Sequence, residues 1–193
     1  LVLNTTPAFA RHWLLPRLGD FRRQHPQVDL WIFSTDEVPD MASQTIDLAV
    51  RDDIGSQAEC SFKVLHADRL YPACHPSLLA VPVEQRTTLQ GEREMDWSHW
   101  AVESGIDVGQ MDQGLNFSDP GLLLDAACTG LGIALVSQLL SQQARANGLL
   151  QPLVEQTIRG PNWALLTHRD SESNARSFSE WLLSNLEAAS PTT

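Results

Sequence analysis

The chain has 193 residues, of which 42% are hydrophobic and 19% charged, a composition typical of a globular protein with one large domain or two lobes. Its 13 basic and 24 acidic side chains give a formal net charge of −11, which argues against binding to a phosphate backbone or an anionic membrane surface. The sequence contains no apolar run of about 18 residues, so no membrane-spanning helix is predicted.

The three cysteines, Cys60, Cys74 and Cys128, are odd in number and irregularly spaced. This pattern favours reduced thiols and a cytoplasmic setting over a disulfide framework. The opening residues, LVLNTTPAFA, are typical of a strand and a turn and lack the basic segment that begins a signal peptide. We expect a chain that opens directly on a strand to be part of a longer protein.

The first half of the sequence alternates predicted strands and helices. Residues 1–5 form the first predicted strand. Thr6 can cap a helix and Pro7 suits its first position, so a helix is predicted from there to about His25, with a kink at Pro16. Further strands are predicted at residues 28–33 and 46–50, and a fourth at residues 62–65 with its continuation at 70–73. Such alternation is typical of a parallel sheet.

The most informative stretch is residues 115–140. A short strand at 115–117 precedes Asp119, a good N-cap, and Pro120, and the helix that follows should end at Gly130 or Gly132. The apolar run 133–136 is typical of a strand buried on both faces. Together these elements predict a βαβ unit whose helix begins at the carboxyl edge of a sheet, where α/β proteins bind ligands.

The remaining elements are predicted from weaker signals. Residues 76–110 are the least readable part, with Trp97 and Trp100 in a predicted helix. A helix from about Ser137 to about Asn147, strands at 149–154 and 163–167 and an amphipathic helix at 175–186 complete the chain, and a frayed tail is expected at 188–193.

In this order and spacing the segments resemble the effector-binding domain of LysR-type transcriptional regulators, within the glycine-cleavage-activator and β-lactamase-regulator branch. The segments that carry the resemblance are FARHWLLPRLGDFRRQHPQVDL, IDLAVRDD, RLYPACHPSLLA, LNFSDPGLLLDAACTGLGIALVSQLL and SFSEWLL. The resemblance implies an α/β fold with two Rossmann-like lobes joined by a two-strand hinge, as in type 2 periplasmic binding proteins. Lobe I would comprise residues 1–71 and 165–193, and lobe II residues 72–164.

The resemblance also implies a function. A small-molecule effector would bind between the lobes and change the geometry of a dimer or tetramer, with the helix after Thr6 paired with the helix after Val136 of a second copy. Promoter DNA would be contacted only by a winged helix-turn-helix domain that precedes this region. We therefore expect a cytoplasmic sensor with no cofactor and no enzymatic activity. The alternative is a periplasmic solute-binding protein of a transporter, which needs a secretion signal or lipid anchor upstream.

The expected effector site combines two helix N-termini, at Thr6 and at Asp119, where unpaired N–H groups favour an anion. Arg51 could hold a carboxylate with its planar fork, and Asp119 could hold an ammonium group, which together suggest a zwitterion such as an amino acid. Ala8 stands where many relatives have serine or threonine, so their effector chemistry does not transfer directly. The predicted contacts are Thr5, Thr6, Ala8, Phe9, Arg51, Cys74, Ser118, Asp119 and Trp163.

Structural roles compete with each of these predictions. Thr6 and Asp119 could serve only as helix caps, and Arg51 could pair with Asp52 or Asp53 at the surface. Trp163 could line the far wall of the site or fill the core. A metal site is disfavoured because the spacing of the candidate ligands lacks a paired CxxC or HxxxH pattern; these are Cys60, His66, Cys74 and His75.

Overall fold

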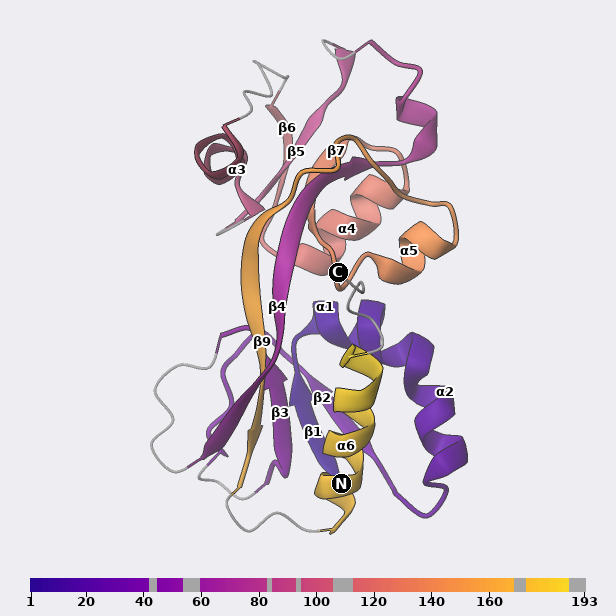
Figure 1. The fold of residues 1–193 in the computed structure, drawn as a ribbon, viewed down its shortest axis with the longest axis vertical. Helices are drawn as coiled ribbons and strands as arrows, with labels where there is room; N and C mark the ends of the chain where they lie inside the picture. The colour runs from indigo at the N-terminus through magenta and orange to yellow at the C-terminus, as the bar shows by residue number, and fades with distance from the viewer. Residues whose placement is uncertain are drawn as a thin grey trace. The chain divides into compact units, whose positions relative to one another are not determined.

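The structure is a computed structural model that describes residues 1–41, 45–53, 60–82, 85–92, 95–105, 113–168 and 173–187. The chain divides into two compact units, drawn as ribbons in Figure 1. Unit 1 consists of Leu1–Ala10, Leu14–Ala67 and Pro161–Thr193, and unit 2 of Arg11–Trp13 and Asp68–Gly160. The predicted lobe boundaries, after residues 71 and 164, fall within the same two strands at which the units change, β4 (Ser61–Cys74) and β9 (Ile158–Thr167).

The sheet of unit 1 is built on three parallel strands. Its strand β1 (Val2–Thr5) lies between β2 (Trp31–Ser34) and β3 (Leu48–Arg51), with Leu3 in register with both Ile32 and Leu48. Strand β9 pairs antiparallel with β3. The predicted parallel arrangement is therefore confirmed for β1 to β3, and their carboxyl ends meet at one edge of the sheet.

The first helical segment of unit 1 contains a π-helical turn. Helix α1 (Pro7–Phe9) continues through the π turn Ala10–Leu14 into α2 (Leu15–Gln24), which ends near His25 as predicted. Pro16 has no N–H and cannot continue the regular hydrogen-bond pattern, and the wider turn immediately before it accommodates this loss, where the sequence predicted a kink.

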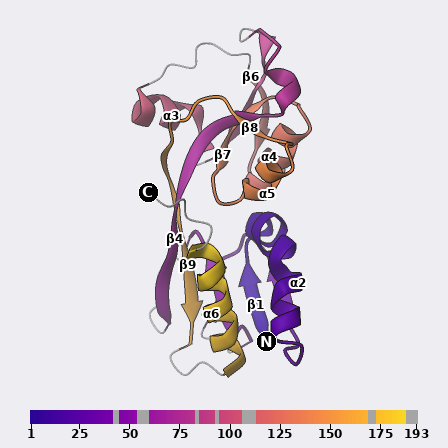
Figure 2. The ribbon, with the colours of Figure 1, turned by 45° about the vertical axis from the view of Figure 1, so that its right-hand side comes forward.

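An aromatic cluster fixes the C-terminal helix of unit 1. Helix α6 (Ser173–Glu187) is drawn next to α2 in Figure 1, and the two helices flank β1 in the view of Figure 2. The Phe21 ring meets Phe178 edge-on with centroids 5.1 Å apart and lies 5.2 Å from Trp181. All three side chains are buried. Residues 188–193, for which a frayed tail was predicted, lie outside the described residues.

Unit 2 contains a second set of parallel strands. Strand β5 (Thr88–Gly91) lies between β6 (Gln113–Phe117) and β7 (Ile133–Ser137), and all three run parallel. Strand β4 pairs antiparallel with β7, so the prediction of parallel strands is wrong for β4, which is a crossover strand rather than part of a βαβ unit. The other elements of unit 2 are α3 (Trp97–Ser104), α4 (Pro120–Cys128), α5 (Gln142–Ala146), β8 (Gln151–Pro152) and a 3-10 turn at Pro76–Leu78.

A buried carboxylate explains why the helix predicted from about Ser137 begins later, at Gln142. Asp68 in β4 is 1% exposed and accepts hydrogen bonds from the Ser137 hydroxyl and, at 3.1 Å, from the backbone N–H of Leu139. These bonds hold the chain after β7 in a turn, with the Ser137 oxygen in turn accepting from Leu140 N–H at 3.0 Å. Within the described part of the chain, no helix is both long and apolar enough to cross a membrane.

Candidate functional site

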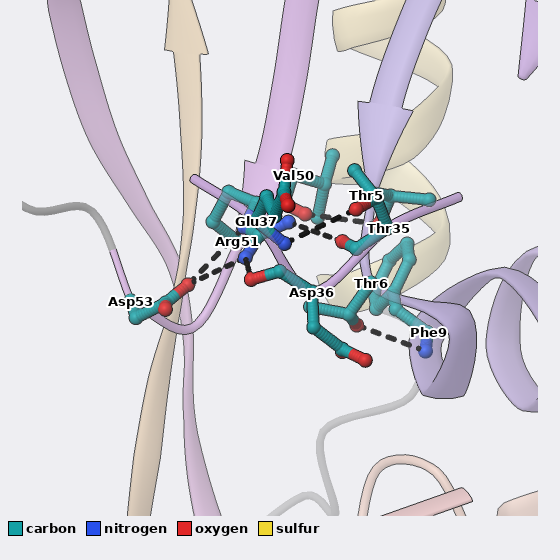
Figure 3. A network of polar contacts seen from close by, with 9 residues as sticks. All are labelled: Thr5, Thr6, Phe9, Thr35, Asp36, Glu37, Val50, Arg51 and Asp53. Carbon is teal, nitrogen blue, oxygen red and sulfur yellow. Dashed lines mark hydrogen bonds and ion pairs between the residues drawn. The ribbon is translucent and has the colours of Figure 1, made fainter. Parts of the chain in front are cut away.

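The carboxyl ends of β1, β2 and β3 form a network of polar contacts at one edge of the unit 1 sheet (Figure 3). The backbone N–H of Thr35, directly after β2, donates to the Thr5 carbonyl at 3.0 Å. The Thr5 hydroxyl donates to the Val50 carbonyl of β3 at 2.9 Å. Three strand ends are thus joined through backbone and threonine groups at the edge where parallel sheets offer ligand sites.

The helical segment begins at this same edge. Thr6 has extended backbone angles, φ −71° and ψ 150°, and its hydroxyl oxygen accepts from the Phe9 N–H at 3.2 Å. Pro7 occupies the start of the helix, as predicted. Thr6 is therefore an N-cap, and since a hydroxyl can accept and donate at once, capping does not use up its donor capacity.

Arg51 is buried inside the edge network, with a side chain only 1% exposed. Its Nε and Nη2 donate to Asp53 Oδ1 at 3.1 and 2.9 Å. Its Nη1 donates to the Thr35 carbonyl at 2.6 Å, and its Nη2 also donates to the Asp36 carbonyl at 2.8 Å. The arginine therefore does pair with Asp53, but from a buried position, whereas the Asp53 side chain is 30% exposed.

Phe9 packs against Trp163, the β9 residue next to Ala164, which is in register with Arg51. Their ring centroids are 4.9 Å apart and the rings are tilted by 39°. Phe9 is completely buried and Trp163 is 2% exposed, and Ala8 beside Phe9 is buried as well. Of the predicted contacts, the structure therefore brings Thr5, Thr6, Ala8, Phe9, Arg51 and Trp163 together in unit 1, with the aromatic pair in the core.

Unit 2 contains the other predicted contacts. Asp119 is the N-cap of α4: its Oδ1 accepts from the Gly121 N–H at 2.8 Å, and Pro120 follows at the helix start. Ser118, immediately before it, is exposed. Cys74 lies at the end of β4 in register with Gln151, and burial raises the pKa of its thiol. The structure thus supplies Ser118 and Asp119 at one helix start and Cys74 on a separate strand.

Comparison with known proteins identifies the family. The model of the LysR substrate binding domain matches residues 1–187. The chain belongs to this family. Residues that hold the edge network and the α4 N-terminus all lie within the match, and the resemblance inferred from the sequence is confirmed.

Relatives of this LysR domain are named as transcriptional regulators. The glycine cleavage system transcriptional activator of Escherichia coli (strain K12) is 28% identical over 200 residues, which cover 97% of this chain and 65% of that protein. The HTH-type transcriptional regulator PerR of the same strain is 31% identical, covering 96% of this chain and 66% of PerR. The chain thus spans just under two thirds of these proteins. Nothing in these matches favours the transporter alternative.

Solved structures agree with the LysR assignment. The effector domain of AmpR from Pseudomonas aeruginosa matches with a TM-score of 0.79 and 24% identity, over 97% of this chain and 96% of that chain. The AmpR effector binding domain from Citrobacter freundii also matches with a TM-score of 0.79, at 21% identity, over 97% of this chain and 98% of that chain. The predicted fold class is confirmed: α/β, with two Rossmann-like lobes of the type 2 periplasmic-binding-protein kind.

Two features of this LysR domain were not predicted. Thr35 was missed, although its place after β2 follows the same strand-end rule that selected Thr5 and Arg51. The direction of the Arg51 side chain could not be predicted, because its carbonyl partners lie 15 and 16 residues earlier in the chain. Among the described residues, no group of three or more His, Cys, Asp or Glu side chains is arranged to hold a metal ion.

Proposed function

We propose that this chain is the ligand-sensing domain of a LysR-type transcriptional regulator that works in the cytoplasm. A small effector would shift the domain between two states only by its differential affinity for them, and that shift would change the geometry of a dimer or tetramer. Promoter DNA would be bound by a helix-turn-helix domain outside this chain, and the sensing domain would catalyse no reaction. The observation that carries the proposal is the LysR substrate-binding match over residues 1–187.

We propose that the direct effector contacts are hydroxyl and carboxylate groups at the two helix starts, namely Thr6, Ser118 and Asp119. Thr6 is itself only 7% exposed. The other buried residues of the predicted set, each at most 3% exposed, would shape the site without offering polar atoms to the effector; these are Thr5, Ala8, Phe9, Arg51, Cys74 and Trp163. One matching structure, an effector binding domain from Citrobacter freundii, carries three substitutions (threonine to valine, serine to alanine, tyrosine to phenylalanine), each of which removes a hydroxyl. We expect an amino acid or a related zwitterion, whose carboxylate would accept from the hydroxyl groups and whose ammonium group would pair with Asp119.

Self-association is supported by an apolar edge on unit 1. Strand β2 stands at the end of the sheet order, and its alternate residues Trp31 and Phe33 are 62% and 53% exposed. Two large aromatic side chains on an edge strand are typical of a protein–protein contact. Sedimentation equilibrium tests this part of the proposal, and a domain that stays monomeric at all accessible concentrations would contradict it.

A thermal-shift screen against amino acids, small carboxylates and peptides tests ligand sensing. A ligand present at about 100 times its Kd adds about 2.7 kcal/mol of stability, which corresponds to a rise in Tm of roughly 5–10 °C for a chain of this size. A reproducible rise from one compound class would support the sensor. A panel without effect, extended to the metabolites of a cell extract, would count against it.

Substitutions that preserve helix capping separate ligand contacts from caps. Aspartate and serine cap helices as well as threonine does, so Thr6→Asp and Thr6→Ser should both keep the fold. If the Thr6 hydroxyl donates to the effector, Thr6→Asp should weaken binding at least about tenfold while Thr6→Ser binds like the original protein, since a hydrogen bond to a charged group contributes about 1.5–3 kcal/mol. In the same way Asp119→Ser keeps the helix cap and removes the negative charge, so it should weaken the binding of an effector that carries an ammonium group. Unchanged affinity in Thr6→Asp and Asp119→Ser would reduce both residues to caps.

A further inference from the structure

The Arg51 guanidinium directs its hydrogen bonds into the protein. All three of its nitrogen atoms donate to protein oxygens: one carboxylate oxygen of Asp53 and the carbonyl oxygens of Thr35 and Asp36. Figure 3 shows Arg51 between Asp53 on one side and Thr35 and Asp36 on the other. With a side chain 1% exposed and its charge matched within the fold, Arg51 is poorly placed to bind an effector carboxylate directly.

The carbonyl groups that Arg51 binds belong to the segment that leaves an edge strand. Within the described sheet β2 pairs only with β1, so the chain beyond Ser34 has a strand neighbour on one side. The Thr35 N–H donates to Thr5 at 3.0 Å, and the Glu37 N–H donates to the Thr35 hydroxyl at 3.1 Å. Arg51, the last residue of β3, binds the Thr35 and Asp36 carbonyls and so connects this segment to β3. The ends of β1, β2 and β3 are therefore all linked by hydrogen bonds.

We propose that Arg51 is a positioning residue of the effector site: with Asp53 as its counter-charge, it holds the segment Thr35–Glu37 against the Thr5–Thr6 end of β1. That this edge binds an effector rests on the proposed function, whereas the positioning of the Thr35–Glu37 segment by Arg51 does not. Lysine cannot replace arginine in this role, because a single ammonium group lacks the planar fork that reaches two carbonyl groups and a carboxylate together. This positioning role replaces the direct binding of an effector carboxylate by Arg51 that the sequence led us to expect.

Amide hydrogen exchange followed by NMR on the whole chain tests the positioning without a ligand. Arg51→Lys removes hydrogen bonds to the Thr35 and Asp36 carbonyls that hold this segment in place. The N–H groups of Thr35 and Glu37 should then exchange about tenfold faster, because the loss of one hydrogen bond makes local opening easier by roughly that factor. The N–H groups of Phe178 and Leu182, in α6 of the same unit, should keep their rates. Arg23→Lys is the matched control, since Arg23 pairs with Asp20 at the exposed surface and should leave every one of these rates unchanged.

A second variant keeps the test decisive if Arg51→Lys does not fold. Asp53→Asn leaves the arginine in place with a neutral partner, and it should speed exchange at the same two amides. Unchanged exchange at Thr35 and Glu37 in both variants would overturn the proposal. Equal acceleration throughout unit 1 would also overturn it, because Arg51 would then be only a general core residue.

The same variants connect the positioning to ligand binding. Each amino acid of the screening panel is titrated into the original protein, Arg51→Lys and Arg23→Lys. Positioning predicts that a compound that binds the original protein loses affinity in Arg51→Lys and keeps it in Arg23→Lys. If no compound binds the original protein, the proposed function fails, while the exchange rates still decide the role of Arg51.

Discussion

Replacing Asp68 should be among the most destabilising single changes in unit 2. Asp68→Ala leaves the Ser137 hydroxyl and the Leu139 N–H without their buried acceptor. The Arg69 N–H, which donates to Asp68 at 2.8 Å, loses its acceptor at a less buried position. Each buried donor left unpaired costs about 1–3 kcal/mol, so we expect a loss of about 2–6 kcal/mol in the free energy of unfolding. That is a large fraction of the roughly 5–15 kcal/mol that stabilises a typical protein.

The size of this effect can be measured against graded variants. Urea unfolding followed by tryptophan fluorescence and by circular dichroism gives the free energy of unfolding for each variant. Asp68→Asn keeps an acceptor oxygen and should lose only about 1–2 kcal/mol. Ser137→Ala removes one donor to Asp68 and the oxygen that accepts from the buried Leu140 N–H, so it should lose about 1–3 kcal/mol. Glu155→Gln, at an exposed position of the same unit, should change stability by less than about 0.5 kcal/mol. The reasoning is refuted if Asp68→Ala is no more destabilising than Glu155→Gln.

Two further predictions concern titration. Desolvation lowers the pKa of His12, against the opposing effect of Asp125, so the folded state favours neutral histidine. The stability contributed by neutral His12 is present above a pH of about 6.5 and is lost as the pH falls towards the folded pKa. His12→Gln should therefore flatten the decline of Tm between pH 7 and pH 5. An unchanged decline would contradict this prediction. Burial raises the pKa of Cys128 to about 11. Its reaction with a disulfide reagent, measured as the difference from Cys128→Ser, should accelerate about tenfold per pH unit between pH 8 and pH 10, and a rate that levels off near pH 8.5 would disprove the shift.

Local signals predicted the elements that local chemistry determines. Asp119 and Pro120 predict the start of α4, and Gly130, with φ of 81°, predicts its end. Thr6 and Pro7 predict the start of the first helical segment. The family resemblance then supplied the two-lobed fold, which periodicity alone could not have given.

The parts that were not predicted depend on contacts distant in sequence. The short strand β5 (Thr88–Gly91) has the sequence TLQG, which lacks the apolar run of a buried strand, and it exists because β6 and β7 pair with it on both sides. The turn after β7 depends on Asp68, which lies 69 residues before Ser137. At the candidate site, sequence reasoning selected Arg51 by its place at a strand end but could not show that its donors are engaged within the fold.

The division of unit 1 among three chain segments has a consequence for synthesis on the ribosome. Strand β3 pairs with β9, with Leu48 in register with Thr167, and the aromatic cluster of Phe21 needs α6. At about 5–20 residues per second, Leu48 waits on the order of ten seconds for its partner strand to be made. Residues 68–160 of unit 2 emerge as one continuous stretch in that interval. We therefore expect the nascent chain to carry an unfinished apolar sheet until β9 emerges, and that interval to be the one in which aggregation during synthesis is favoured most.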